Sequence, residues 1–164
     1  SQGRIHVGMR HSSDETIKAA KMELEKYMEY WGPPDARRYH HYWRDKNGTW
    51  QHKELPWVAG TVPVIFLDKD DNAYLIYGAT KRPEIPMKMH STDHNCTIAA
   101  TSAKSKWTDW KVIHVEQGTF FSDPLADPYR WKKEGVLSVI VQESPKKNAA
   151  PSPLRILDFS FGTD

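Results

Sequence analysis

The sequence predicts an all-β protein built from antiparallel, four-stranded blades of the β-propeller type, with one inserted α-helix. Short alternating segments recur, tight polar turns join them in pairs, and a Trp follows the turn in the first two repeats. The repeats read RIHVGMRH with YHHYWRDKNGTW, VPVIFLDKDDNAYLIYGA with CTIAATSAKSKWTDWKVIHV, and FSDPLADPYRWKKEGVLSVIVQES with SPLRILDFSF. We expect a partial ring of about two and a half blades.

The α-helix is expected as an insertion after the first strand, which covers residues 4–9. Ser12 and Glu15 have the spacing of a capping box, in which each side chain accepts a hydrogen bond from a free backbone amide of the first turn. Apolar residues then recur at helical spacing, and the Gly-Pro-Pro sequence at 32–34 ends the pattern. The predicted helix covers about residues 14–31.

The other strands are expected as hairpins. The segments with strand patterning are 37–44, 49–55, 62–67, 73–77, 96–101, 110–116, 124–126, 135–142 and 154–161. Asn-Gly tolerates a positive φ, so 45–48 is predicted to be a tight turn, and the Asp- and Asn-rich segment 68–72 is predicted to be another. Residues 127–134 are interpreted as a turn, and 144–152 as a loop. The unbroken apolar runs at 62–67 and 73–77 predict a hairpin whose strands are covered on both faces.

The composition excludes several classes of protein. The formal net charge is +2 and the basic residues are scattered, which argues against a nucleic-acid partner. A single cysteine, Cys96, leaves no internal disulfide and no Cys-based zinc site in this segment. The longest apolar runs are only as long as strands, so no membrane-spanning helix is predicted.

Two Asn-X-Thr triplets begin at Asn47 and Asn95. Such triplets are acceptors for N-glycosylation in a secreted protein, and Asn47 lies in a predicted exposed turn. We therefore predict both asparagines as glycosylation sites and the extracellular space as the location of the protein.

Several segments, taken in order, resemble the C-terminal part of the BNR-type (sialidase-like repeat) propeller proteins. They are GRIHVGMRH, RRYHHYWRDKNGTW, DKDDNAYLIYG, SKWTDWKVIH, DPLADPYRWKKEGVLSVIVQ and PLRILDF. The turns at 46–50 and 104–108 are degenerate versions of the family's Ser-x-Asp-x-Gly-x-Thr-Trp box. The resemblance implies that residues 1–164 are the C-terminal segment of one propeller domain, whose remaining blades come from sequence not present here.

The family includes polysaccharide lyases, so the resemblance implies a secreted enzyme that cleaves an acidic, uronic-acid-containing glycan by β-elimination. This reaction needs a cation to neutralise the carboxylate, a base for the adjacent proton and an acid for the leaving oxygen. Arg binds a carboxylate through two parallel hydrogen bonds, and His and Tyr can move protons. The predicted catalytic residues are His11, Tyr39 and His40, and the predicted substrate-binding residues are Arg10, Arg37, Arg38, Arg82 and Asp123.

Two other functions stay open. A sialidase-like glycoside hydrolase would use an arginine cluster, a Tyr nucleophile and an acidic partner, whereas a non-catalytic glycan-binding propeller would need no positioned base. No cofactor is expected. The acidic turn at 68–72 leaves structural calcium as an option because hard cations prefer oxygen ligands, although the turn lacks the later bidentate Glu and the central Gly of an EF-hand loop.

Overall fold

The computed structural model describes residues 4–13, 15, 37–80, 94–144 and 151–161, and these ranges form nine strands. The strands are β1 (His6–Ser12), β2 (Arg37–Arg44), β3 (Trp50–Val58), β4 (Val64–Leu67), β5 (Ala73–Thr80), β6 (His94–Thr101), β7 (Lys111–Ala126), β8 (Val136–Glu143) and β9 (Leu154–Ser160). A 3-10 turn, η2 (Ala103–Ser105), precedes β7, and a short helix, α3 (Pro128–Glu134), precedes β8. All strand pairs are antiparallel.

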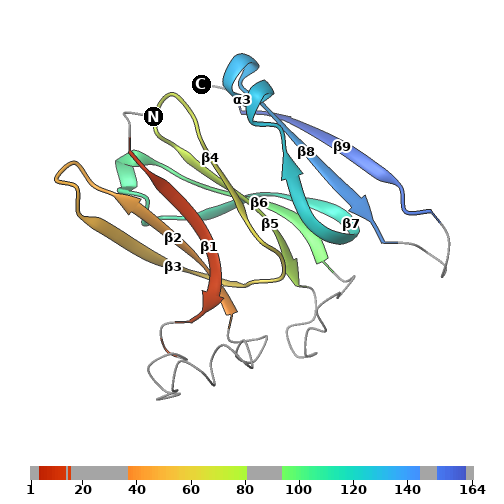
Figure 1. Ribbon diagram of the computed structural model, residues 1–164, viewed down its shortest axis with the longest axis horizontal. Helices are drawn as coiled ribbons and strands as arrows, with labels where there is room; N and C mark the ends of the chain where they lie inside the picture. Colours follow the sequence, from red (N-terminus) through yellow and green to blue (C-terminus); the bar gives the residue numbers. More distant parts are fainter. Residues whose placement is uncertain (1–3, 14, 16–36, 81–93, 145–150, 162–164) are drawn as a thin grey trace.

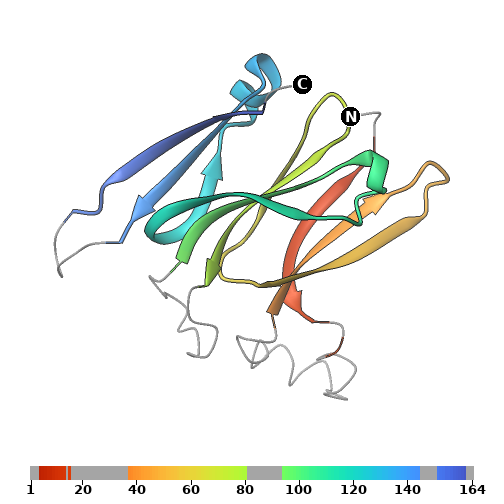
Figure 2. The same cartoon turned by 180° about the vertical axis from the view of Figure 1, so that it is seen from behind.

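The strands form three stacked layers (Figures 1 and 2). The first sheet has the order β1-β2-β3, and β4 to β9 are hydrogen-bonded in sequence order. The long strand β7 divides the second group, because residues 111–116 pair with β6 and residues 121–126 pair with β8, while Phe120 between them pairs with both His94 of β6 and Glu143 of β8. Gly118, with a φ of +144°, lies between the two halves. We call β4-β5-β6 with the first half of β7 the middle sheet, and the second half of β7 with β8 and β9 the last sheet.

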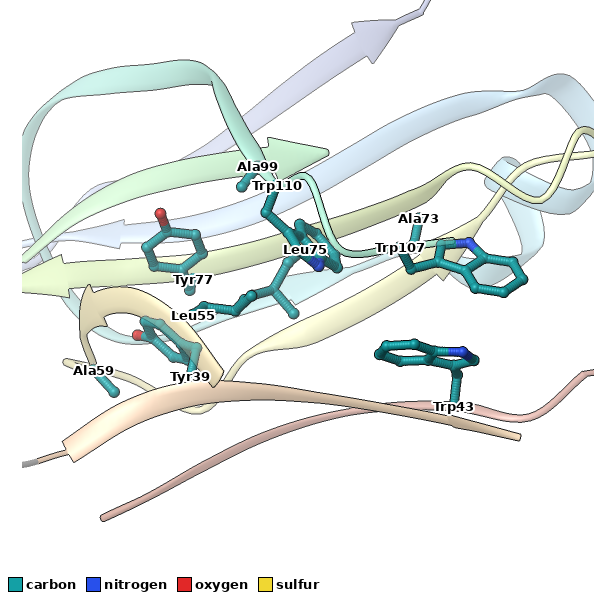
Figure 3. Close-up of a cluster of buried hydrophobic side chains, with 10 residues drawn as sticks. All are labelled: Tyr39, Trp43, Leu55, Ala59, Ala73, Leu75, Tyr77, Ala99, Trp107 and Trp110. Carbon is teal, nitrogen blue, oxygen red and sulfur yellow. The ribbon is translucent and has the colours of Figure 1, made fainter. Parts of the chain in front are cut away.

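The middle sheet is buried on both faces. Successive strand residues point to opposite faces, so Leu75 and Tyr77 of β5 pack toward the first sheet while Ile76 packs toward the last sheet. Figure 3 shows the cluster between the first and middle sheets, where Tyr39 of β2 meets Tyr77 of β5, and Trp43 of β2 meets Trp107. Full burial of a residue such as Leu75 contributes about 1.5–3 kcal/mol. The prediction that the apolar hairpin is covered on both faces is confirmed for β5, whose residues 73–78 are all buried.

The prediction of an all-β fold made of antiparallel, blade-like sheets is also confirmed. The middle sheet has the four strands expected of a blade, and within the described ranges the first and last sheets have three each. The helix predicted at about 14–31 lies outside the described residues, apart from Glu15. The segments predicted separately at 110–116 and 124–126 are parts of one bent strand, β7.

The interpretation of residues 127–134 as a turn was wrong, because this segment is the helix α3. The Asp127 carboxylate caps it by accepting hydrogen bonds from the amides of Tyr129 (2.8 Å) and Arg130 (3.2 Å). Pro128 occupies the first turn, where its missing amide hydrogen costs nothing. Gly135, with a φ of +68°, ends the helix in the left-handed conformation that favours glycine.

The turn predicted at 68–72 is organised by its own carboxylate, as is the turn that begins at Asp45. Asp68 Oδ1 accepts hydrogen bonds from the amides of Asp70 (2.8 Å) and Asn72 (2.9 Å), and Asp68 Oδ2 accepts from the Asn72 amide group and the Tyr74 hydroxyl. This is the ordinary role of Asp in a tight turn. Both oxygens of Asp68 are therefore engaged within the protein.

Candidate functional site

The predicted site residues of the first sheet gather where β1 ends and β2 begins. Figure 1 shows the end of β5 and the start of β6 at the same edge of the molecule. The antiparallel register pairs Arg10 with Tyr39 and His11 with Arg38, and it continues to Ser12 and Arg37. Directly opposed residues of an antiparallel pair present their side chains to the same face. Arg38 and His11 therefore share the outer face of the first sheet.

His11 is held as one defined tautomer next to a tyrosine. Its Nδ1 lies 2.9 Å from the backbone oxygen of Ser12, and its Nε2 lies 2.9 Å from the hydroxyl of Tyr42. A carbonyl oxygen can only accept a hydrogen bond, so Nδ1 carries the proton of the neutral imidazole. Nε2 then has the lone pair and accepts the hydrogen bond that the Tyr42 hydroxyl donates.

Two further histidines extend this contact along the same face. The His40 ring stacks on His11 with a centroid distance of 3.5 Å, and its Nδ1 lies 2.8 Å from Nε2 of His52. The Tyr42 ring stacks on His52 at 4.5 Å. We call His11, His40, Tyr42 and His52 the His11 network. Its members come from β1, β2 and β3. They form two hydrogen-bonded pairs, His11 with Tyr42 and His40 with His52, and the rings of the two pairs stack on each other.

Tyr39, predicted as catalytic, lies on the opposite face of β2 and is 0% exposed. Its hydroxyl donates to the backbone oxygen of Gly78 (3.0 Å) and accepts from the amides of Gly60 (3.1 Å) and Thr61 (3.2 Å). Burial raises the pKa of Tyr39 to about 12. Through these contacts, the Tyr39 hydroxyl joins β2, β5 and the segment after β3. This role is structural. The tyrosine that contacts His11 is Tyr42, which the sequence reasoning did not select.

A signal for Tyr42 was present in the sequence. In the strand pattern of 37–44, Tyr42 alternates with Arg38 and His40 on one face, whereas Tyr39 falls on the other. That period indicates which side chains share a face. It contains no information on which residue of β1 lies across from them.

The predicted substrate-binding residues are dispersed. Arg10 donates from Nη1 to the backbone oxygen of Gly60 (2.9 Å), and Arg38 donates from Nη1 to the backbone oxygen of Arg37 (3.0 Å). Asp123 accepts a hydrogen bond from the Val62 amide through Oδ1 (2.7 Å). Arg10 and Asp123 thus contact the same segment, 60–62, from two sheets. Arg82 lies outside the described residues.

The two predicted glycosylation sites, Asn47 and Asn95, both lie within the described residues. Asn47 is exposed in its turn, and the Asn95 side chain accepts a hydrogen bond from the hydroxyl of Thr97, the third residue of its own triplet (2.9 Å).

Among the residues that the structure describes, His, Cys, Asp and Glu form no group of three that could hold a metal ion. No helix in the described ranges is long and apolar enough to cross a membrane.

No protein-family model matches the chain, and no curated protein matches it at a significant level. A proposal of function therefore depends on the contacts of the residues themselves.

Proposed function

We propose that the chain is part of a secreted polysaccharide lyase that cleaves a uronic-acid-containing glycan by β-elimination. The observation that carries the proposal is the 2.9 Å hydrogen bond from the Tyr42 hydroxyl to Nε2 of His11. The contact of Nδ1 with the Ser12 oxygen supports it by leaving Nε2 as the proton acceptor. A phenol that can release its proton to an adjacent imidazole is suited to general acid–base catalysis.

In the net reaction, one proton moves from C5 of the uronate to the leaving glycosidic oxygen. Tyr42 gives its proton to His11, and the resulting phenolate oxygen removes the proton from C5 of the uronate. The electron pair of the C5–H bond forms the C4–C5 double bond, and the bond between C4 and the glycosidic oxygen breaks. Tyr42 then protonates the leaving oxygen, and His11 returns the first proton to Tyr42. The proton lost from C5 is therefore the one gained by the leaving group.

Arg38 is the residue we propose for the substrate carboxylate. It is the register partner of His11 and lies on the same face as Tyr42. A guanidinium can bind a carboxylate through two parallel hydrogen bonds. Such a contact would stabilise the charge that develops on the carboxylate when the C5 proton leaves, which is where a fixed cation contributes most.

The test is incubation of the protein with uronate-containing polysaccharides, followed by ultraviolet absorbance of an unsaturated uronate and by an assay for new reducing ends. Both signals together are the expected result. Reducing ends without the absorbance would indicate a hydrolase, and binding without either signal would indicate a glycan-binding module. Each of these two results would overturn the lyase proposal.

The roles of individual residues are tested with Tyr42→Phe, which keeps the ring and removes the exchangeable proton. We expect turnover to fall about 10²–10⁴-fold, the usual contribution of a positioned acid or base. Tyr129→Phe is the matched control, because Tyr129 lies on α3, is 83% exposed and is distant from the His11 network. Undiminished turnover by a folded Tyr42→Phe protein would refute the assignment.

A further inference from the structure

A cavity of about 470 Å³ lies beside α3, next to the turn between β4 and β5. This turn and α3 lie at the end of β5 opposite to the edge where β1 ends and β2 begins (Figures 1 and 2). The cavity is therefore separate from the His11 network. Its volume is within the range of small-ligand sites, about 300–1,000 Å³.

Three aromatic rings make one wall of this cavity. Tyr74 and Phe161 stack with centroids 4.5 Å apart, and Trp131 meets Tyr74 edge to face at 5.5 Å. The indole nitrogen of Trp131 donates a 2.7 Å hydrogen bond to the backbone oxygen of Leu67. The polar edge of the indole is thus used within the protein, and the ring surface that lines the cavity is apolar.

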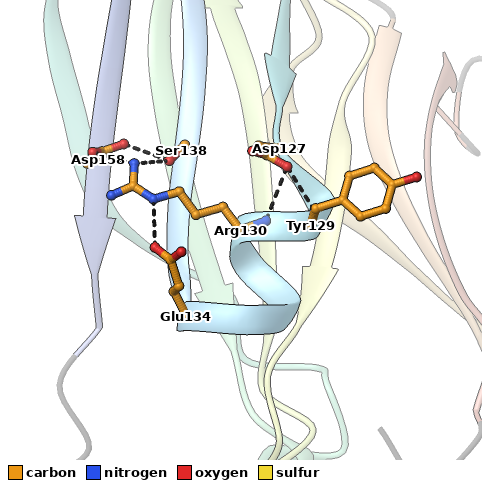
Figure 4. Close-up of polar contacts among 6 residues, drawn as sticks. All are labelled: Asp127, Tyr129, Arg130, Glu134, Ser138 and Asp158. Carbon is orange, nitrogen blue, oxygen red and sulfur yellow. Dashed lines mark hydrogen bonds and ion pairs between the residues drawn. The ribbon is translucent and has the colours of Figure 1, made fainter.

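The helix that carries Trp131 is fixed on the last sheet by a polar network (Figure 4). Arg130 contacts Asp158 at 2.6 Å, Ser138 at 2.8 Å and Glu134 at 3.0 Å. Ser138 also donates to Asp158 at 2.7 Å. The ring of Trp131 is therefore held in place before any ligand binds, which reduces the entropy lost on binding.

The rim of the cavity is charged. Lys69, Asp70 and Lys132 line it, and within the described part of the chain their side chains form no ion pair. Asp68 also lines it, but both of its oxygens are engaged in the turn. Two ammonium groups and one carboxylate thus remain to meet a ligand. This combination favours a ligand that has an anionic group together with hydroxyl donors.

We infer that this cavity binds an acidic saccharide unit. The flat C–H face of a pyranose ring would pack on Trp131, because both surfaces are apolar and similar in size. Its carboxylate or sulfate would lie toward Lys69 and Lys132, and its hydroxyl groups would donate to Asp70. The site is a binding site only, and it stands whether or not the His11 network performs an elimination.

The test measures binding of an oligogalacturonate by tryptophan fluorescence and by NMR chemical shifts. The protein carries Tyr42→Phe, which suppresses turnover and keeps this result distinguishable from failure of the proposed reaction. Lys132→Ala is expected to weaken binding about tenfold, the loss of one hydrogen bond to a charged group. Lys133→Ala is the matched control, because it removes the neighbouring lysine of α3, which does not line the cavity.

A second comparison tests the aromatic wall with two substitutions, and the acidic specificity with two sugars on the same protein. Trp131→Phe reduces the stacking surface and is expected to weaken binding as well, whereas Tyr129→Phe on the same helix should leave it unchanged. A neutral cello-oligosaccharide should bind more weakly than the oligogalacturonate. Equal affinity for the two sugars would overturn the acidic specificity. Binding that Lys132→Ala and Trp131→Phe leave intact would overturn the site.

Discussion

Acidification is expected to destabilise this fold through one buried histidine, His41. This side chain is 0% exposed between the first and middle sheets. Its ring stacks on Trp43 at 4.9 Å and meets the edge of Trp110 at 5.2 Å, and its Nε2 lies 3.0 Å from Nδ1 of His6. A protonated ring would also carry a hydrogen on Nδ1, for which the described residues offer no acceptor. The folded state therefore favours neutral His41.

The size of this loss of stability follows from the difference between the pKa values of His41 in the folded and unfolded states. Burial, and then the nearby His6 and His52, lower the pKa of His41 from 6.5 to about 3. Above 6.5 both states are neutral and the fold has its full stability. Below 6.5 only the unfolded state binds the proton, so stability falls by about 1.4 kcal/mol per pH unit until the folded pKa is reached. At about pH 5 the expected loss is about 2 kcal/mol.

The assay is urea unfolding of the wild-type protein and of His41→Gln at about pH 7.5 and about pH 5. Other histidines and carboxylates titrate in both proteins, so the difference between the two pH dependences isolates His41. The wild type should lose about 2 kcal/mol more than the variant. Burial also lowers the pKa of His6, which adds to the loss with the same sign in both proteins and therefore leaves their difference unchanged.

Parallel pH dependences for the two proteins would refute this reasoning. An NMR titration of the His41 ring supplies a second measurement that does not need the variant to fold. A folded-state pKa near that of an exposed histidine would show that the fold accommodates the charged ring, and it would remove the cause of the expected destabilisation.

Two further substitutions test the packing and the role of a predicted catalytic residue. Gly8→Ala should destabilise the chain by about 1–3 kcal/mol in urea unfolding, because its Cβ would lie 2.9 Å from Leu75 Cδ1; unchanged stability would contradict the close approach of the first two sheets. Tyr39→Phe should cost about 1–3 kcal/mol, because two buried backbone amides lose their acceptor, while turnover per folded molecule stays the same. Lost turnover at full stability would instead support catalysis by Tyr39.

Local patterning predicted much of the fold. The strand predicted at 37–44 coincides with β2, because its alternation and its Asn-Gly turn are properties of neighbouring residues. The helix α3 also had local signals, with Asp127 before it, Pro128 as its first residue and Gly135 after it. The interpretation of 127–134 as a turn between two strands did not include those signals.

The site was less predictable, because its contacts join distant parts of the chain. His11 and Tyr42 are separated by 31 residues in sequence, and their hydrogen bond depends on the register between β1 and β2. The cavity depends on Tyr74, Trp131 and Phe161, which approach one another only when α3 and the end of β9 pack against the middle sheet. No repeat or motif in the sequence connects these residues.

By itself the sequence determined the all-β class, most of the strands and the face on which each β2 side chain lies, because alternation and turn formation depend on residues a few positions apart. Only the tertiary structure decided that Tyr42 rather than Tyr39 contacts His11, and that an aromatic cavity forms beside α3. These features depend on strand register and sheet stacking, whose free energy comes from pairing and burial between segments far apart in the chain.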